Sequence, residues 1–189
     1  MRRVLAAAAL TIFALSACAV PAYTCTDPLG CLEIPSGSPV VIGLLYTSEG
    51  PNASFGLDAL EQVEQAIEAK EFLLGHEIDL IREGTDCTAE GDREAATRLA
   101  RTSNLLAVIG PTCLSESEIT YSILRNAGLA MEPILWDATT LTPYRPNASA
   151  ATDLLFTAIE QVAIRGRGGM LYIPRTALRE ALEKNGDIP

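Results

Sequence analysis

The sequence predicts an α/β fold with a doubly wound, mainly parallel sheet flanked by helices. Apolar runs rich in β-branched residues alternate three times with segments of helical periodicity, and short connections join them. The first of these runs is continuous, which is typical of a central strand covered on both faces. Right-handed crossovers between such strands place helices on the two faces of one sheet.

The first half of the chain supplies two strands and two helices. Residues 40–46 form the continuous apolar run and predict the first strand. Residues 55–70 carry apolar side chains at helical spacing with acidic residues outside them, which predicts an amphipathic helix. Residues 77–81 alternate and predict a second strand, and residues 88–102 predict a second helix.

The next unit repeats this order. Residues 105–109 are an apolar strand. A Ser-x-x-Glu capping box predicts a third helix over 115–126, which Gly128 should end. Residues 129–131 then predict a short fourth strand.

The alternation breaks after Pro133, where residues 139–149 form a polar loop that contains proline. The elements expected after this loop are a helix over 150–164, a glycine-rich turn over 166–169, a short strand over 170–173 and a helix over 174–185.

The N-terminus has the order of a secretory signal peptide, with Arg2 and Arg3 before an apolar run over 4–15. This run is well short of the ~20 residues that a membrane-spanning helix needs. Residues 15–18, LSAC, resemble the lipobox of bacterial lipoproteins, in which Cys18 is lipidated and becomes the new N-terminus. An ordinary signal peptide that is cut nearby is the alternative.

We therefore divide the chain into a signal peptide over 1–17, a lipidated tether over 18–38 and a single α/β lobe over 39–189. Within the lobe, residues 39–142 form the core, and residues 147–189 form C-terminal helices that return to it. Cleavage leaves 172 residues, which is enough for one domain with a real core but too few for two large lobes.

The mature chain is strongly acidic. Cleavage removes two arginines, so the net charge changes from −10 to −12, with 12 basic and 24 acidic residues remaining. This balance argues against a nucleic-acid partner, which requires a clustered basic face.

Four cysteines follow Cys18, and an extracytoplasmic location favours disulfides between them. Three pairings are conceivable, and we expect Cys25 to pair with Cys31, closing a small loop, and Cys87 with Cys113. A zinc site is the alternative use, but the spacings are not of the CxxC kind.

Ligands of open α/β sheets bind beyond the carboxyl ends of the strands, where the strand order reverses. The loops concerned are 47–55, 110–115 and 133–137. The helix that begins at Ser115 would present unpaired backbone N–H groups to a carboxylate. The alternative is that Ser115 only caps its own helix and Gly110 makes a tight turn.

Other loop residues suit a small zwitterion. Asp137 could pair with an ammonium group, and Trp136 or Phe55 could cover an apolar side chain. Their structural alternatives are a turn for Asp137, a surface position for Trp136 and core packing for Phe55.

The sequence gives no catalytic residue, metal site or cofactor. Its one histidine, His76, lies at the start of a strand, where a solvated edge position is expected. The GxGxxG, GxxxxGK[ST] and GxSxG motifs are absent. We do not expect an enzyme.

Six stretches between about Cys25 and Thr142 form a recognisable series: CTDPLGC, PVVIGLLYTSEGPNASFG, LLGHEIDL, TDCTAE, AVIGPTCLSES and NAGLAMEP. They resemble the type I periplasmic binding proteins that serve branched-chain amino acid ABC transporters. The spacing of Cys87 and Cys113 is similar to that of the family's disulfide. The stretches ATDLLFTAIEQVAI and MLYIPRTALREAL look like the helix, hairpin and helix near the family's C-terminus.

A member of this family has two α/β lobes with the ligand between them. Here the second lobe, expected between Thr142 and about Pro146, is missing, so the chain resembles one lobe alone. The resemblance places Phe55 where the family has an aromatic side chain beside the ligand. It places Leu114 where a serine usually binds the ligand's carboxylate.

The family's ligand-binding loop after the fourth strand corresponds to residues 133–137, which include Leu135 and Asp137. Leu114, Trp136 and Asp137 depart from the family pattern. Carboxylate recognition would therefore depend on Ser115.

These features predict an extracytoplasmic solute-binding lipoprotein of an ABC transporter for branched-chain or other amino acids. Its partners would be an amino acid or similar zwitterion, the transporter permease, the bacterial membrane through the lipid anchor, and a second copy that covers the exposed face. The alternative is a sensory or protein-interaction lipoprotein, or a remnant, with no small-molecule ligand.

Overall fold

The computed structural model describes residues 23–113, 117–134, 136–137, 142–143 and 147–185. For Ser117, Asn185 and residues 136–137 and 142–143 it describes the backbone alone. Among the described helices, none has the length and apolar character needed to cross a bilayer.

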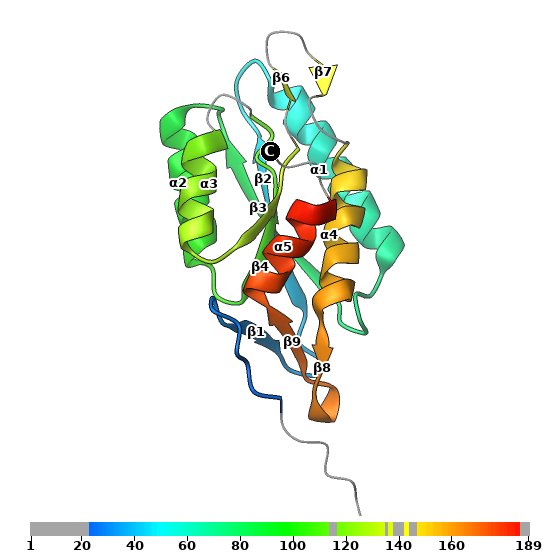
Figure 1. Ribbon diagram of the computed structural model, residues 1–189. Helices are drawn as coiled ribbons and strands as arrows, with labels where there is room; N and C mark the ends of the chain where they lie inside the picture. The colour runs from blue at the N-terminus through cyan, green and yellow to red at the C-terminus, as the bar shows by residue number, and fades with distance from the viewer. Residues whose placement is uncertain (1–22, 114–116, 135, 138–141, 144–146, 186–189) are drawn as a thin grey trace, which may run out of the picture.

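Four parallel strands form the central sheet (Figure 1). In chain order they are β2 (Val40–Thr47), β3 (Ile78–Thr85), β4 (Leu105–Ile109) and β5 (Ala130–Glu132). In space the order is β3-β2-β4-β5, so the chain moves outwards from β2 to β3 and then crosses back to β4 and β5. This reversal confirms the predicted doubly wound parallel sheet.

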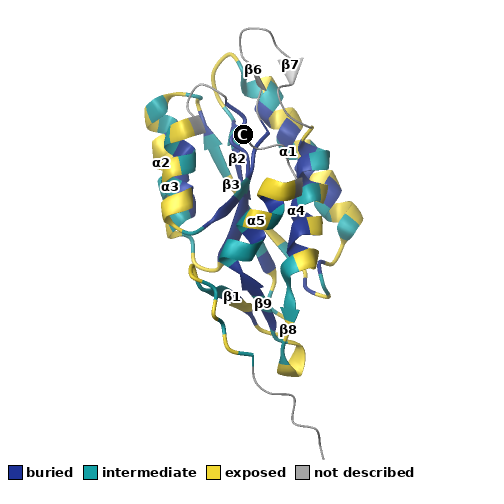
Figure 2. Ribbon diagram, viewed as in Figure 1, coloured by how far each residue is buried: buried dark blue, intermediate teal, exposed yellow. Residues whose placement is uncertain are grey.

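Helices cover both faces of the sheet (Figure 1). One face holds α1 (Ala53–Lys70), α4 (Ala148–Val162) and α5 (Arg175–Asn185), and the other holds α2 (Ala89–Arg101) and α3 (Ser117–Asn126). Each layer buries its own hydrophobic cluster against the sheet (Figure 2). Because successive strand residues point to opposite faces, Leu44 enters the first cluster and Leu45 the second.

A small antiparallel sheet lies at the amino end of the central strands (Figure 1). Its order is β1-β9-β8, with β1 at Cys31–Ile34, β8 at Ile164–Arg165 and β9 at Leu171–Pro174. A 3₁₀ turn at Arg167–Gly169 joins β8 to β9. This turn is the predicted glycine-rich turn.

Strand β1 corrects the predicted tether. The sequence placed residues 31–34 within the tether over 18–38, but Leu32 is only 7% exposed and Ile34 only 3%. Four residues are too few to show a pattern, and the partner strand, β9, lies far away in the sequence. The folded domain therefore begins before residue 39.

Two short paired strands, of two residues each, follow the carboxyl end of β5. They are β6 (Trp136–Asp137) and β7 (Thr142–Pro143), which run antiparallel. The predicted polar loop over 139–149 is thus partly paired, and α4 begins inside it because the Asn147 side chain accepts a hydrogen bond from the backbone N–H of Ala150 at 2.8 Å.

The strand at 105–109 and the second helix lie where they were predicted, whereas β3 runs four residues beyond its predicted end. The extension is polar because its side chains reach the helices on either face. Arg82 bonds to Glu64 of α1 at 2.7 Å, and Glu83 accepts a bond of 2.7 Å from Arg98 of α2.

Both predicted disulfides are present, Cys25–Cys31 and Cys87–Cys113. The expectation for His76 is wrong. Its side chain is buried, and Nδ1 lies 2.8 Å from the carbonyl oxygen of Ser38. This contact joins the start of β3 to the turn before β2.

Candidate ligand-binding site

The strand order reverses between β2 and β4, which are neighbours in the sheet. The helix after β2, α1, lies on one face, and the helix after β4, α3, lies on the other. The connections that leave β2 and β4 therefore diverge at the carboxyl ends of these strands. Open α/β sheets bind their ligands at such a point. We call the segments 47–56, 85–88 and 110–113, which follow β2, β3 and β4, the carboxyl edge.

Two buried threonines join the first and third segments of this edge. The backbone N–H of Thr47 donates to Oγ1 of Thr112 at 2.9 Å, and the two hydroxyls are also 2.9 Å apart. Oγ1 of Thr47 lies 3.1 Å from Sγ of Cys113. Both threonines are less than 5% exposed, so these bonds form away from water. They fix the loop after β4 to the end of β2.

The disulfide brings in the segment after β3. Cys87 is bonded to Cys113, and its backbone N–H donates to Oγ1 of Thr85 at 3.2 Å. The Thr85 hydroxyl in turn donates to Oδ1 of Asp92, which is buried in the first turn of α2. The ends of three strands are therefore connected by one continuous set of bonds.

Two glycines allow the backbone to pass closely at this edge. A Cβ atom on Gly56 would lie 1.9 Å from the carbonyl oxygen of Thr47, so the first turn of α1 can rest on the end of β2 only with glycine there. Gly110 has φ +103°, and a Cβ atom on it would lie 2.2 Å from the carbonyl oxygen of Leu45. Gly110 therefore has a backbone conformation that favours glycine, at a point where a side chain would collide with β2.

The predicted ligand residues are described only in part. Phe55 lies in the first turn of α1 at the carboxyl edge and is half-buried. The backbones of Trp136 and Asp137 form β6, at the same end of the molecule (Figure 1).

Leu114, Ser115 and Leu135 lie outside the described residues, as does the predicted start of the third helix at 115. Its predicted end is confirmed, since Gly128 follows α3 with φ +75°.

Sequence reasoning missed Glu132. It is the last residue of β5, it is 1% exposed, and its carbonyl oxygen accepts a bond of 2.8 Å from the backbone N–H of Gly110. Met131 packs against the cluster under α2 and α3, so Glu132 points towards the opposite face. A carboxylate at the end of an otherwise apolar strand was the signal that could have identified it.

The exposed charged residues of the carboxyl edge are acidic. Glu49 and Asp86 are exposed there, and hydrogen bonds from the side chain and backbone of Thr88 hold the pKa of Asp86 below its ordinary value. Among the described residues, no group of His, Cys, Asp and Glu is arranged to hold a metal ion.

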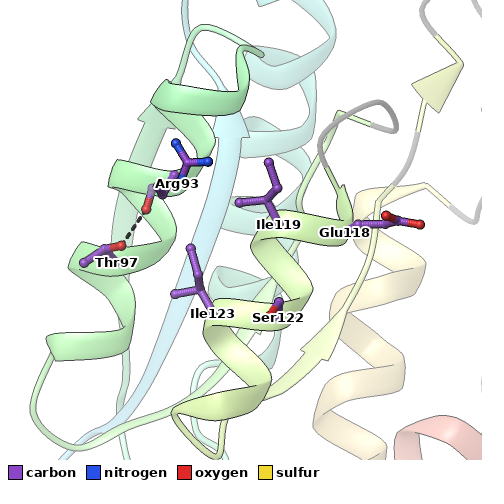
Figure 3. Close-up of a pocket in the computed structure, with 6 residues that line it drawn as sticks. All are labelled: Arg93, Thr97, Glu118, Ile119, Ser122 and Ile123. Carbon is purple, nitrogen blue, oxygen red and sulfur yellow. Dashed lines mark hydrogen bonds between the residues drawn. The ribbon is translucent and has the colours of Figure 1, made fainter.

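Two open grooves lie elsewhere, between helices. Figure 3 shows the first, between α2 and α3, which is lined by Arg93, Thr97, Glu118, Ile119, Ser122 and Ile123. The second, between α1 and α4, is lined by Gln65, Ala66, Ala69, Lys70, Ser149 and Asp153. Phe55, the predicted ligand residue whose side chain the structure describes, lines neither groove. Strand topology and the bonded loops therefore favour the carboxyl edge as the ligand site.

No protein-family model matches the chain, and no curated protein matches it. A leucine-binding protein from Thermotoga maritima has a similar structure, with 24% identity and a TM-score of 0.49 over 52% of this chain and 28% of that protein. A branched-chain amino acid transporter substrate-binding protein from Streptococcus pneumoniae, in complex with isoleucine, has 17% identity and a TM-score of 0.49 over 53% of this chain and 30% of its own.

A solute-binding protein of an ABC transporter from R. palustris, in complex with 4-hydroxybenzoate, is 14% identical. It matches 78% of this chain and 44% of its own, with a TM-score of 0.46. The chain thus spans less than half of the length of each of these three proteins.

Proposed function

We propose that this chain is the solute-binding lipoprotein of an ABC transporter and that it holds an amino acid, or another small zwitterion, at the carboxyl edge. The observation that carries the proposal is the bonding of three strand ends at the point where the strand order reverses. Thr47, Thr112 and the Cys87–Cys113 disulfide make this edge a fixed wall. A fixed wall binds a ligand without first having to be ordered.

Each predicted residue has a role in this proposal. The start of the helix at Ser115, with the neighbouring Leu114, would receive the carboxylate, because backbone N–H groups at a helix N-terminus attract anions. Asp137 would pair with the ammonium group. Phe55 and Leu135 would cover the apolar side chain of the solute. Glu132 is a further candidate for the ammonium group.

A single wall limits the affinity. Ligand sites normally bury roughly 70–90% of the ligand surface, and one lobe covers only about half. If two walls give about −8 kcal/mol, near 1 μM, half of the contacts leave about −4 kcal/mol, near 1 mM. We propose that a second copy of the chain supplies the opposite wall. A sedimentation experiment that finds only monomers at high concentration would contradict this part.

The proposed anchor is an acyl group on Cys18, which places the protein outside the cytoplasm on the bacterial membrane. Tyr23, the first described residue, comes five positions after Cys18. An extended chain of that length spans at most about 18 Å, so the domain would stay close to the bilayer. Cys18→Ser should move the protein from the membrane fraction to the soluble fraction. A variant that stays with the membrane would refute the anchor.

The main test is thermal unfolding of the mature chain with millimolar amounts of each amino acid. At ten times the dissociation constant, a ligand stabilises the folded state by about 1.4 kcal/mol. For a domain of this size that raises the Tm by about 3–6 °C. We expect such a shift with Leu, Ile or Val. No shift with any amino acid, from a chain that unfolds cooperatively, would refute an amino acid as the ligand.

The chain offers a matched pair of variants for this test. Phe55 lies at the carboxyl edge, whereas Phe72 follows the other end of α1 and is 48% exposed. Phe55→Ala should reduce the ligand-induced shift, and Phe72→Ala should preserve it. Equal effects of the two changes would remove Phe55 from the site.

The second candidate function is protein interaction or sensing without a small-molecule ligand. The open groove between α2 and α3 favours it, because this groove mixes charged, hydroxyl and apolar side chains on an exposed helical layer. A stable protein partner together with no response to amino acids would select this function.

A further inference from the structure

The N-terminal disulfide loop contacts the C-terminal helix. Residues 25–31 form a loop closed by the Cys25–Cys31 bond, and Asp27 lies within it. The Asp27 carboxylate accepts hydrogen bonds from the backbone N–H of Thr176 at 3.0 and 3.1 Å, from the Thr176 hydroxyl at 2.8 Å and from the backbone N–H of Ala177 at 3.3 Å. Asp27 therefore caps the N-terminus of α5 from 149 residues away.

The loop also holds its own shape around this carboxylate. The backbone N–H of Leu29 donates to Oδ1 of Asp27 at 2.9 Å, and that of Gly30 donates to the Asp27 carbonyl oxygen at 2.9 Å. Burial opposes ionisation of Asp27, but the hydrogen bonds from Thr176, Leu29 and Ala177 outweigh it and hold the pKa of the carboxyl below its ordinary value. The cap is therefore charged at neutral pH.

Arg175 extends the contact into the central sheet. Its backbone N–H donates to the carbonyl oxygen of Gly30 at 3.1 Å. Its guanidinium group donates to the carbonyl oxygens of Leu105 at 3.3 Å and Gly128 at 3.5 Å. Leu105 begins β4, and Gly128 lies just before β5. The loop, the start of α5 and the amino ends of two central strands are thus joined.

Helix α5 in turn supports the strand that leads to the ligand site. Its buried side chains, Leu178 and Leu182, belong to the hydrophobic cluster that also contains Ala130 of β5. Among the described strands of the central sheet, β5 lies at the edge beside β4. Its position consequently depends on the helices packed against it.

We propose that the Cys25–Cys31 loop is a redox-sensitive clamp on α5. While the disulfide is closed, Asp27 is held against the N-terminus of α5; when a dithiol reduces it, the loop opens and that end of the helix is released. In the reaction the sulfur–sulfur bond of the protein breaks and both cysteines become thiols. The dithiol supplies two protons and two electrons and closes its own disulfide.

The clamp requires the Cys25–Cys31 disulfide to be more accessible to a reductant than the Cys87–Cys113 disulfide. Cys25 and Cys31 are both half-buried, and Thr26, Pro28 and Leu29 between them are exposed. In the other disulfide Cys113 is only 5% exposed and Cys87 is half-buried. A dithiol thus has two half-buried sulfurs to attack in Cys25–Cys31 but one in Cys87–Cys113, which favours reduction of Cys25–Cys31 first.

The test is hydrogen exchange of the mature chain before and after treatment with limiting dithiothreitol, with alkylation and mass spectrometry to identify the reduced bond. Reduction should occur first at Cys25–Cys31. It should speed exchange in the first turn of α5 about tenfold, because that turn loses its cap. Exchange in α2 is the internal control and should not change. Reduction of Cys87–Cys113 first, or unchanged exchange in α5, would overturn the proposal.

A double-mutant cycle separates the clamp from a general loss of stability. The variants are Asp27→Ala, the pair Cys25→Ser and Cys31→Ser, and all three changes together. If the disulfide acts through Asp27, Asp27→Ala and the double cysteine variant should each speed exchange at the Thr176 amide. The variant with all three changes should then exchange little faster than either of them. Fully additive effects would show that the disulfide and the cap act independently, and the clamp would be refuted.

Discussion

The pair formed by Thr47 and Thr112 gives the sharpest test of the candidate site, because its two hydroxyls have unequal roles. Oγ1 of Thr112 accepts the backbone N–H of Thr47 and also contacts the Thr47 hydroxyl, each at 2.9 Å. Thr112→Val removes the acceptor of a buried N–H and should cost about 1–3 kcal/mol. Thr47→Val leaves that N–H bonded and should cost about 0.5–1.5 kcal/mol.

Thermal and urea unfolding of the two variants measure this difference. A loss of 2 kcal/mol lowers the Tm of a domain of this size by about 4–8 °C. Thr97→Val is the matched control, because the Thr97 hydroxyl donates to the carbonyl oxygen of Arg93 on an exposed helix, and it should change stability by less than about 0.5 kcal/mol. If Thr47→Val costs as much as Thr112→Val, the two hydroxyls do not have the unequal roles that these bonds imply.

Three further predictions concern other parts of the fold. Gly110→Ala should destabilise the protein far more than Gly75→Ala in urea unfolding, since both residues have positive φ but only Gly110 has backbone within contact of a new Cβ atom; equal losses would contradict the close approach. Asp27→Asn should lower the Tm at neutral pH, and the difference from the parent chain should shrink as the pH falls through the pKa of Asp27, which lies below its ordinary value of 3.8; a difference that is constant with pH would argue against a charged cap. His76→Phe should lower the Tm by removing the bond to the Ser38 carbonyl oxygen, and an unchanged Tm would show that this contact contributes nothing.

The central strands could be predicted because runs of consecutive apolar residues indicate buried strands. Residues 105–109 are all apolar and all buried in β4, so pattern and structure coincide. The second half of β3 could not be predicted in this way. This part of the strand contains the charged residues Arg82 and Glu83, which bond to helices on opposite faces of the sheet. The sequence alone does not show which helices these are.

Contacts between distant parts of the chain account for the remaining misses. β1 is four residues long and pairs with β9, and the turn that buries His76 is made by Ser38. Neither partner can be found by reading along the chain. The same reason hid the role of Asp27, whose partners lie 149 and 150 residues later. Glu132 was different, since a charged residue at the end of an apolar strand was visible and was not used.

The bonds at the carboxyl edge matter more for a one-walled site than they would for an enclosed one. A ligand that touches one wall gains few contacts, so any free energy used to order the loops on binding would remove much of its affinity. Here the loops after β2, β3 and β4 are already held by two buried hydroxyls, a disulfide and the close approach of Gly56. Under the proposed function, little of the binding free energy would therefore be used to order these loops.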